Sequence, residues 1–243
     1  MHPTILRLAA TALLMAATCS GQAPDSGLVT SGKASFYSDD FHGQETSSGD
    51  ALNQNDFTAA HKTLPFGTIV SVTNKKNGKN VIVRINDRGP FVKSRIIDVT
   101  RSAARKLEMV PFGVVPVKIQ VLELLDNFPL SDTLMKNDML YNCYGRQGNF
   151  SGNTIYIWST SDMRHAFYMA TSIVIDYGLD SVLLRATGNP GNKRFKIYAT
   201  GIATEVEANR LAATFRKDGF MFSKFYSEKK SSEDARPSGQ SVK

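Results

Sequence analysis

The sequence predicts a mainly β protein that continues into an α+β domain, that is, a small β-barrel followed by a four-stranded sheet with two helices on one face. Between residues 32 and 125, short stretches alternate apolar and polar side chains, and Gly and Pro residues separate them. Beyond residue 152, a strand–helix–strand pattern occurs twice with an offset of 41 residues. The first observation is typical of a small barrel, and the second of two βαβ halves that share one sheet.

The composition limits the class of protein. Of the 243 residues, 42% are hydrophobic and 21% are charged, so the chain can bury cores and is not disordered as a whole. Its two cysteines exclude a disulfide-rich scaffold and a four-cysteine zinc site, and its single short apolar run excludes a multi-pass membrane protein. The formal net charge of +7 indicates an acidic partner, which charge alone leaves open between nucleic acid, an anionic membrane and an anionic polymer.

Residues 1–19 predict a secretory signal peptide. Arg7 precedes an apolar run of about ten residues, 8–17, and small residues follow it. The run is shorter than the roughly 20 residues that cross a bilayer as a helix, and a buried N-terminal helix is the alternative. We therefore expect an exported protein of the periplasm or cell envelope, whose partner is an anionic envelope polymer and not nucleic acid. Removal of Arg7 with the signal lowers the net charge from +7 to +6.

Cys19 raises the question of a lipid anchor. It follows Ala16-Ala17-Thr18, which is similar to the signal of bacterial lipoproteins, although the usual branched residue is missing. Two outcomes stay open: lipidation of Cys19, which would anchor the chain in the outer membrane, or ordinary cleavage of the signal. Both leave Cys143 without an intramolecular partner, so we expect no structural disulfide.

The first domain is predicted over residues 32–125. Asn77-Gly78 separates two alternating stretches and accepts the positive φ of a tight hairpin turn. The patterns predict strands at residues 68–73, 79–85 and 115–122 and one short helix at residues 100–107.

Three segments have the composition of linkers or tails. Residues 20–31 are rich in Ser, Gly, Pro and Asp, and residues 126–152 contain several Gly, Asp and Asn residues, so both are predicted to be linkers. Residues 227–243 are charged and rich in Ser, which predicts a flexible tail. The second domain then occupies residues 153–226.

Two helices are predicted inside the repeat. Apolar residues recur at helical spacing over Met163–Tyr177 and over Ala208–Phe215. The segment Thr204–Glu207 is a capping box, in which the two side chains satisfy free backbone N–H groups at the start of a helix. Gly178 and Gly219 suit the left-handed residue that ends a helix. The repeat therefore predicts a sheet of four strands with both helices on one face.

The polar residues of the first domain that are candidates for chemistry are few. Asp87 follows an apolar strand, where a rigid scaffold can hold a carboxylate in a cleft. The alternative is turn chemistry, because Asp in Asn-Asp-x-Gly-Pro often bonds its own backbone. The full set is His42, Asp50, His61, Asp87, Arg88 and Asp98.

Other kinds of site find less support. Residue types alone leave a Ser-His-Asp triad open, although no Gly-x-Ser-x-Gly turn is present. A metal ion held by His42 and His61 with nearby carboxylates is also open, but their spacing of 19 residues matches no helical ligand motif. The Gly-rich segments lack the phosphate-loop pattern. We therefore predict no metal and no cofactor.

Short blocks in the first domain follow one another in a set order. They are Gly32–Tyr37, Phe41–Gly43, Thr46–Gly49, Thr58–Thr68, Val72–Asn74, Asn77–Gly78, Val83–Phe91 and Arg95–Asp98. In this order they resemble the RlpA (rare lipoprotein A) family. The resemblance implies a six-stranded double-psi β-barrel, the fold of the expansin catalytic-like domain, and a septal lytic transglycosylase of the periplasm that cleaves peptidoglycan glycan strands.

The resemblance also implies roles for particular residues. Asp87 is the implied acid and base, Asp50 a neighbouring carboxylate or second catalytic group, and His61 the residue that orients either one. An acid that works at neutral pH needs its pKa raised well above about 3.9, by burial or by a neighbouring carboxylate. The residues expected to contact the substrate are Arg88, Tyr37, Phe36, His42 and Thr46.

The second domain resembles the SPOR domain, which in this family binds glycan strands without stem peptides. Residues 203–211, followed by Gly219-Phe220, are the best-matching block. The resemblance implies a ferredoxin-like βαββαβ arrangement and names no divisome partner.

The sequence departs from the family pattern at several positions. Asp50 stands where the family usually has Glu, and a displacement near 1 Å can reduce a rate about a hundredfold. Phe36 replaces the common Trp and Ser38 the common Gly, while in the second domain the usual Gln, Gly and Phe are replaced by Tyr156, Trp158 and Thr160. Two hypotheses follow: a lytic transglycosylase, or an expansin-like protein that binds or remodels peptidoglycan without cleaving it.

Overall fold

The structure is a computed structural model, and it describes residues 28–122, 138–142, 146–179, 181–189 and 192–226. The predicted signal peptide, Cys19, Cys143 and the predicted tail lie outside the described residues, as do large parts of both predicted linkers. No helix in the described ranges is long and apolar enough to span a membrane.

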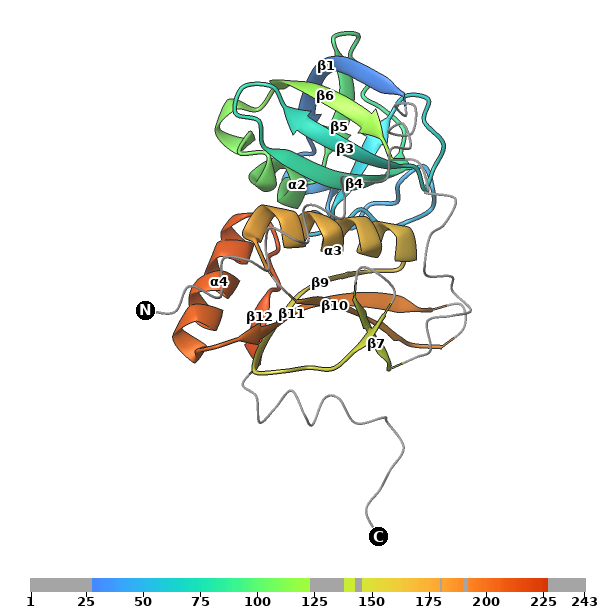
Figure 1. The fold of residues 1–243 in the computed structure, drawn as a ribbon. Helices are drawn as coiled ribbons and strands as arrows, with labels where there is room; N and C mark the ends of the chain where they lie inside the picture. The colour runs from blue at the N-terminus through green and yellow to red at the C-terminus, as the bar shows by residue number, and fades with distance from the viewer. Residues whose placement is uncertain (1–27, 123–137, 143–145, 180, 190–191, 227–243) are drawn as a thin grey trace, which may run out of the picture.

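Six strands close into a barrel in the order β1-β5-β2-β4-β3-β6, with β6 paired back to β1 (Figure 1). β1 runs parallel to β5, and β2 runs parallel to β4, whereas the remaining neighbours are antiparallel. The elements of this domain are β1 (Val29–Phe36), η1 (Asp39–Phe41), β2 (Thr58–His61), β3 (Ile69–Asn74), β4 (Asn80–Asp87), β5 (Arg95–Val99), α2 (Arg101–Lys106), η2 (Val110–Phe112) and β6 (Val115–Val121).

The alternating sequence of β4 shows how the barrel interior is filled. Val81, Val83 and Ile85 are fully buried, because every second side chain of a strand points to the same side. Gly78 adopts a φ of 72° in the turn between β3 and β4, as the Asn77-Gly78 pair predicts.

β1 begins earlier than the domain boundary predicted at residue 32. Val29 and Thr30 pair with Gln120 and Ile119 of β6, although their segment has the composition of a linker. The pairing partner lies far along the sequence, so local composition carries no sign of it.

The second domain is a six-stranded sheet in the order β12-β9-β11-β10-β7-β8 with two helices. From β9 to β12 the elements follow the βαββαβ order that the repeat predicts, and every neighbouring pair is antiparallel. The elements are β7 (Leu140–Asn142), β8 (Gln147–Gly148), β9 (Asn153–Thr160), α3 (Met163–Tyr177), β10 (Val182–Thr187), β11 (Arg194–Ile202), α4 (Glu205–Lys217) and β12 (Lys224–Tyr226).

The segment predicted to be a linker, 126–152, contains two strands of this sheet. β7 pairs with β10 and extends the sheet beyond the four predicted strands, and β8 pairs with β7. Strands of two and three residues are too short to show an alternating pattern, which explains why the sequence does not reveal them.

Both helices begin and end as their sequences predict. The side chain of Thr204 accepts a hydrogen bond from the backbone N–H of Glu207, which caps the start of α4. Gly178 follows α3 in the left-handed conformation, with φ 62° and ψ 37°. Asp162 caps α3 through the backbone N–H of His165, a cap that the analysis of the sequence did not predict.

The two domains share one hydrophobic core. α3 lies between the second sheet and the barrel (Figure 1), and buried residues of both domains form a single cluster. Within it, Phe57 of the barrel contacts two rings of the second domain, Trp158 at 5.4 Å and Phe220 at 4.8 Å between centroids. The barrel is therefore joined to the second domain by packed aromatic rings, in addition to the chain that connects them.

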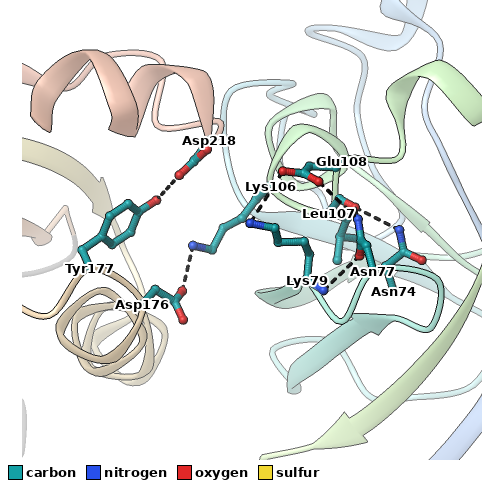
Figure 2. Close-up of polar contacts among 9 residues, drawn as sticks. All are labelled: Asn74, Asn77, Lys79, Lys106, Leu107, Glu108, Asp176, Tyr177 and Asp218. Atoms are coloured by element: carbon teal, nitrogen blue, oxygen red, sulfur yellow. Dashed lines mark hydrogen bonds and ion pairs between the residues drawn. The ribbon is translucent and has the colours of Figure 1, made fainter. Parts of the chain in front are cut away.

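Polar contacts border this core, as Figure 2 shows. The ammonium of Lys106, from α2 of the barrel, lies 2.9 Å from the Asp176 carboxylate of α3 and 5.2 Å from the ring centroid of Tyr177. The Tyr177 hydroxyl donates to Asp218 at 2.7 Å. Gly219 fits here because it has no side chain, since a Cβ atom would collide with the backbone carbonyl of Ser102.

Phe57→Ala tests whether this junction stabilises both domains. Deleting a fully buried aromatic ring costs about 3–5 kcal/mol, so we expect a loss of that size in the free energy of unfolding measured with urea. Trp158 fluorescence, which reports the junction, and far-UV circular dichroism, which reports both domains, should give one coincident transition.

Phe112→Ala is the matched control, because Phe112 is 62% exposed and its loss should cost less than about 1 kcal/mol. A Phe57→Ala protein as stable as the control, or separate fluorescence and dichroism transitions in the wild type, would contradict the shared core.

Candidate functional site

A cleft of about 610 Å³ crosses four neighbouring strands of the barrel, β1, β5, β2 and β4. Polar and apolar side chains both contribute to its wall, so it suits a ligand that has both kinds of surface. The lining residues are Phe36, Tyr37, Ser38, Phe41, Gln44, Glu45, Ser47, Leu52, Ala60, Asp87, Arg88, Gly89, Pro90, Phe91, Val92, Arg95 and Asp98.

Two aspartates of the cleft stand on either side of Ala60. In the register of the barrel, Ala60 of β2 lies opposite Asp87 of β4 and also opposite Asp98 of β5. Because the side chain of Ala60 is only a methyl group, it leaves room for the cleft to extend between the two aspartates.

Asp87 is held by four hydrogen bonds. Its Oδ1 accepts from the backbone N–H and the hydroxyl of Ser47, at 2.9 and 2.7 Å, and from the backbone N–H of Arg88 at 2.8 Å. Its Oδ2 accepts from the Tyr37 hydroxyl at 2.9 Å. The carboxylate therefore has a fixed orientation, and three separate segments of the barrel domain determine it.

These bonds favour the charged form of Asp87. Burial acts to raise its pKa, but the hydrogen bonds from Ser47, Arg88 and Tyr37 outweigh burial, and the pKa lies below its ordinary value. This differs from the expectation that burial or a neighbouring carboxylate raises it. In the ligand-free cleft Asp87 is a carboxylate at neutral pH, ready to accept a proton.

Tyr37 stays protonated beside this carboxylate. Burial raises the pKa of its phenol strongly, and the negative charges of Asp87 and Asp98 raise it further. The phenol thus remains a hydrogen-bond donor to Asp87 throughout the physiological pH range.

Asp98 is a second carboxylate in the cleft. It accepts a hydrogen bond from the hydroxyl of Ser35, its neighbour on β1, and lies 3.8 Å from the guanidinium of Arg95. The sequence places Asp98 among the polar candidates but gives it no role. The pairing of β5 with both β1 and β2 brings it to the cleft.

Comparison with known proteins shows which family has this barrel. A double-psi β-barrel family model described as "Lytic transglycolase" matches residues 29–119, which correspond to the barrel. A relative from Campylobacter jejuni, named "Endolytic peptidoglycan transglycosylase RlpA", is 51% identical over 199 residues, which cover 77% of this chain and 69% of the relative. The chain belongs to the RlpA family.

Other similar proteins match the barrel over a shorter range. A Neisseria meningitidis relative with the same name is 52% identical over 101 residues, and the match covers 42% of each chain. A Pasteurella multocida relative is 52% identical over 99 residues, which cover 41% of this chain and 34% of the relative. Among solved structures, an apo expansin of Clavibacter michiganensis covers 72% of this chain at 14% identity with a TM-score of 0.35, which is too low to support an inference.

Asp50 does not line the cleft, although the RlpA resemblance makes it a partner of Asp87. Its carboxylate accepts from the Arg84 guanidinium at 2.9 Å and from the Asn86 amide at 3.2 Å. Burial acts to raise its pKa, but Arg84, Asn86 and the Ser48 hydroxyl outweigh it, and the pKa is lowered. Asp50 therefore acts on Asp87 only through its hydrogen bonds to Arg84 and Asn86, which precede Asp87 on β4.

His61 and Arg88 both support the turn that follows β2. The His61 Nδ1 accepts from the backbone N–H groups of Thr63 and Leu64, at 3.2 and 3.0 Å. The Arg88 guanidinium donates to the carbonyls of His61 and Leu64, at 3.3 and 2.8 Å, and lies 3.8 Å from the ring centroid of Phe66. Burial, together with the charges of Arg88 and Lys62, lowers the pKa of His61, so its ring is neutral at neutral pH.

The remaining predicted contact residues divide between the cleft and its support. Phe36 lines the cleft, with the Arg101 guanidinium 4.7 Å from its ring centroid. His42 lies outside the lining and accepts from the backbone N–H of Gln54 at 3.2 Å. Thr46 is buried and bonds the carbonyl of Asp50 at 2.9 Å. Both His42 and Thr46 thus hold loops in place.

Ser47 is a residue of the cleft that the sequence did not single out. It gives Asp87 two of its four hydrogen bonds, whereas its neighbour Thr46 faces inward. The sequence does point to this segment, because Ser47 belongs to the RlpA-like block Thr46–Gly49. That block contains three residues with hydroxyl groups, and residue types alone do not tell which of them faces the carboxylate.

Within the described ranges, no three His, Cys, Asp or Glu residues are grouped so that they could hold a metal ion.

Ser47→Ala tests the cause of the lowered pKa. Loss of the hydroxyl removes one hydrogen bond to the charged form, so the titration midpoint of the Asp87 carboxyl should move upward, as followed by carbon-13 NMR. Ser38→Ala is the control, because the Ser38 hydroxyl lines the same cleft but bonds Asp40. A midpoint unaffected by Ser47→Ala, or a wild-type midpoint above the ordinary value, would refute this explanation.

Proposed function

We propose that this protein is a lytic transglycosylase that cleaves the MurNAc–GlcNAc bond of peptidoglycan glycan strands and leaves 1,6-anhydroMurNAc ends. The observation that supports it is the position of Asp87, fixed and ionised in an open cleft of the barrel that matches the "Lytic transglycolase" model. The relatives named as endolytic peptidoglycan transglycosylases support the same reaction and substrate.

The reaction needs one proton to change place. The C6 hydroxyl oxygen of MurNAc bonds to its own C1, the bond from C1 to the leaving O4 breaks, and the proton of the C6 hydroxyl ends on O4. No water is consumed, so the reaction does not require the paired carboxylates that position water in hydrolases. One carboxyl group that accepts and returns a proton, as Asp87 can, completes the transfer without a net change in its charge.

A bound glycan would shift Asp87 towards the donor role. A sugar that covers the cleft increases the burial of the carboxylate, and burial favours its neutral form. The Ser47 and Tyr37 hydroxyls can also turn to the ligand, which weakens their support of the charged form. Both effects raise the pKa of Asp87 in the complex above its value in the free protein.

A second function is favoured by the same hydrogen bonds. A carboxylate held ionised is a poor proton donor, and Asp50 is paired with Arg84 and lies outside the cleft lining. These features suit a protein that binds or remodels peptidoglycan without cleaving it, in the manner of an expansin.

We also propose that the second domain is a SPOR-type, ferredoxin-like module that binds glycan without stem peptides. Its βαββαβ order supports this. Tyr156 and Tyr198 stand opposite each other on β9 and β11, with ring centroids 5.7 Å apart, and Phe150 packs against Tyr198 at 5.1 Å. Tyr198 is buried in a small cluster with Leu140 and Leu183, so of these three rings only the half-buried Tyr156 and Phe150 are available for contact with the apolar faces of sugars.

The same proposal places the protein in the bacterial envelope. Export through the predicted signal peptide would bring it to peptidoglycan in the periplasm, and lipidation of Cys19 would anchor it in the outer membrane. The positive net charge favours association with the anionic cell wall.

Asp87→Asn tests the catalytic role. The amide cannot exchange a proton, so release of anhydro-ended fragments from peptide-free glycan, followed by mass spectrometry, should fall by about 10²–10⁴-fold. Binding of the variant to the same glycan should persist, because the neighbouring donors remain in place.

Glu205→Gln is the control, since it removes an exposed carboxylate of α4 and should leave cleavage unchanged. Equal cleavage by wild type and Asp87→Asn would exclude Asp87 as the acid and base. Binding without fragments from either protein would favour the non-cleaving function.

A further inference from the structure

Two phenylalanine rings of the cleft are open to solvent. Phe91 is 92% exposed and Phe41 is 46% exposed, and both line the same cleft as Asp87. Neither ring contributes much to the hydrophobic core, because a side chain stabilises the fold only by the apolar area that it removes from water. Exposed aromatic rings beside a cleft are typical of a surface that becomes covered when a ligand binds.

The two rings come from two different segments of the cleft wall. The cleft crosses the row β1-β5-β2-β4. Phe41 belongs to η1, which follows β1, whereas Phe91 lies in the connection from β4 to β5, shortly after Asp87. The Tyr37 ring lies beside Phe41, with centroids 6.1 Å apart, and its hydroxyl donates to Asp87.

The backbone that carries each ring is held in place before any ligand arrives. Pro90 precedes Phe91 and restricts the backbone there, and the next carbonyl, that of Val92, accepts from the Arg95 backbone N–H at 3.2 Å and from the Lys62 ammonium at 3.3 Å.

Phe41 is secured in a similar way. Its own N–H donates to the Ser38 carbonyl at 3.2 Å, and its carbonyl accepts from Gln44 at 3.1 Å. Because the backbone at both rings is already ordered, binding a ligand has to order only the two side chains.

The polar groups that share the cleft with the rings indicate the kind of ligand. Beside Phe41 and Phe91, the lining includes Asp87, Ser47 and Tyr37, whose two hydroxyls donate to the Asp87 carboxylate. A suitable ligand has flat apolar faces and a polar rim, which describes a chain of pyranose rings, whose C–H faces stack on aromatic rings while the hydroxyls bond polar groups.

We propose that Phe41 and Phe91 are two stacking platforms that hold sugar rings of one glycan strand in the cleft, so that a glycosidic bond of the strand lies over Asp87. This rests on the proposed function for its substrate, a glycan of the peptidoglycan type. The platforms act in binding: they fix the position of the strand, and Asp87 handles the proton. Their contribution is the same for the substrate and the transition state, so it lowers KM and leaves kcat nearly unchanged.

The test measures binding separately from cleavage. In the full chain carrying Asp87→Asn, the affinity for a peptide-free GlcNAc–MurNAc oligomer of six or more sugars is measured by calorimetry, alone and combined with Phe91→Ala or Phe41→Ala. We expect each alanine variant to weaken binding about tenfold, and Phe91→Trp to restore it. Phe112→Ala is the matched control, because this exposed ring lies outside the cleft and should leave the affinity unchanged.

Two results of this binding experiment would overturn the proposal. A loss below about twofold for both alanine variants, or a loss in Phe112→Ala as large as in Phe91→Ala, overturns the platforms. In the cleaving wild-type background, the same substitutions should raise KM, and a fall in kcat with KM unchanged would contradict them.

The experiments can refute the transglycosylase activity and the stacking platforms independently of each other. If the wild type binds glycan but releases no anhydro-ended fragments, while Phe91→Ala still weakens binding, the platforms stand and the transglycosylase does not. If the wild type cleaves and the alanine variants bind and cleave normally, the platforms alone are refuted.

Discussion

The set of hydrogen bonds around Asp87 is the constraint on which the functional account depends. The donors come from positions 50 and 40 residues earlier in the chain, Tyr37 and Ser47, and from the next residue, Arg88. They meet only when these strands are assembled side by side, since β1 and β4 are separated by β5 and β2 in the barrel wall. The same bonds set the orientation and the charge of the carboxylate. The chemistry of the cleft therefore depends directly on the fold of the barrel.

The junction between the domains gives this site a rigid support. Phe57 packs against Trp158 and Phe220, and the close contact of Gly219 with Ser102 lets the second domain approach the barrel. Around this core, Lys106 pairs with Asp176. A glycan held by the second domain would therefore meet the barrel at a fixed distance and angle, since packed cores of this kind resist deformation. This differs from two modules on a flexible tether, the arrangement that the predicted linker implied.

The sequence predicted the elements whose signal is local. The hairpin at Asn77-Gly78, the strands on either side of it and both helices of the repeat follow from periodicity and capping. The early start of β1 and the strands β7 and β8 depend on distant partners or are too short to show a period. The site divides in the same way. The block around Asp87 predicted that this residue lies in a cleft, and it does, whereas the presence of Ser47 and Asp98 in the cleft lining, in place of Thr46 and Asp50, depends on side-chain directions that only the assembled barrel determines.

The proposed role of Asp87 is to transfer the proton of the MurNAc C6 hydroxyl to the leaving O4 of the neighbouring GlcNAc, without activating water. The most direct test is digestion of peptide-free glycan by the full chain in oxygen-18 water, followed by mass spectrometry of the new ends. The account predicts anhydro-ended fragments without oxygen-18. Reducing ends that carry the label would show hydrolysis, and an intact glycan bound to the protein would show a site that holds its substrate without cutting it. Either result would contradict the account.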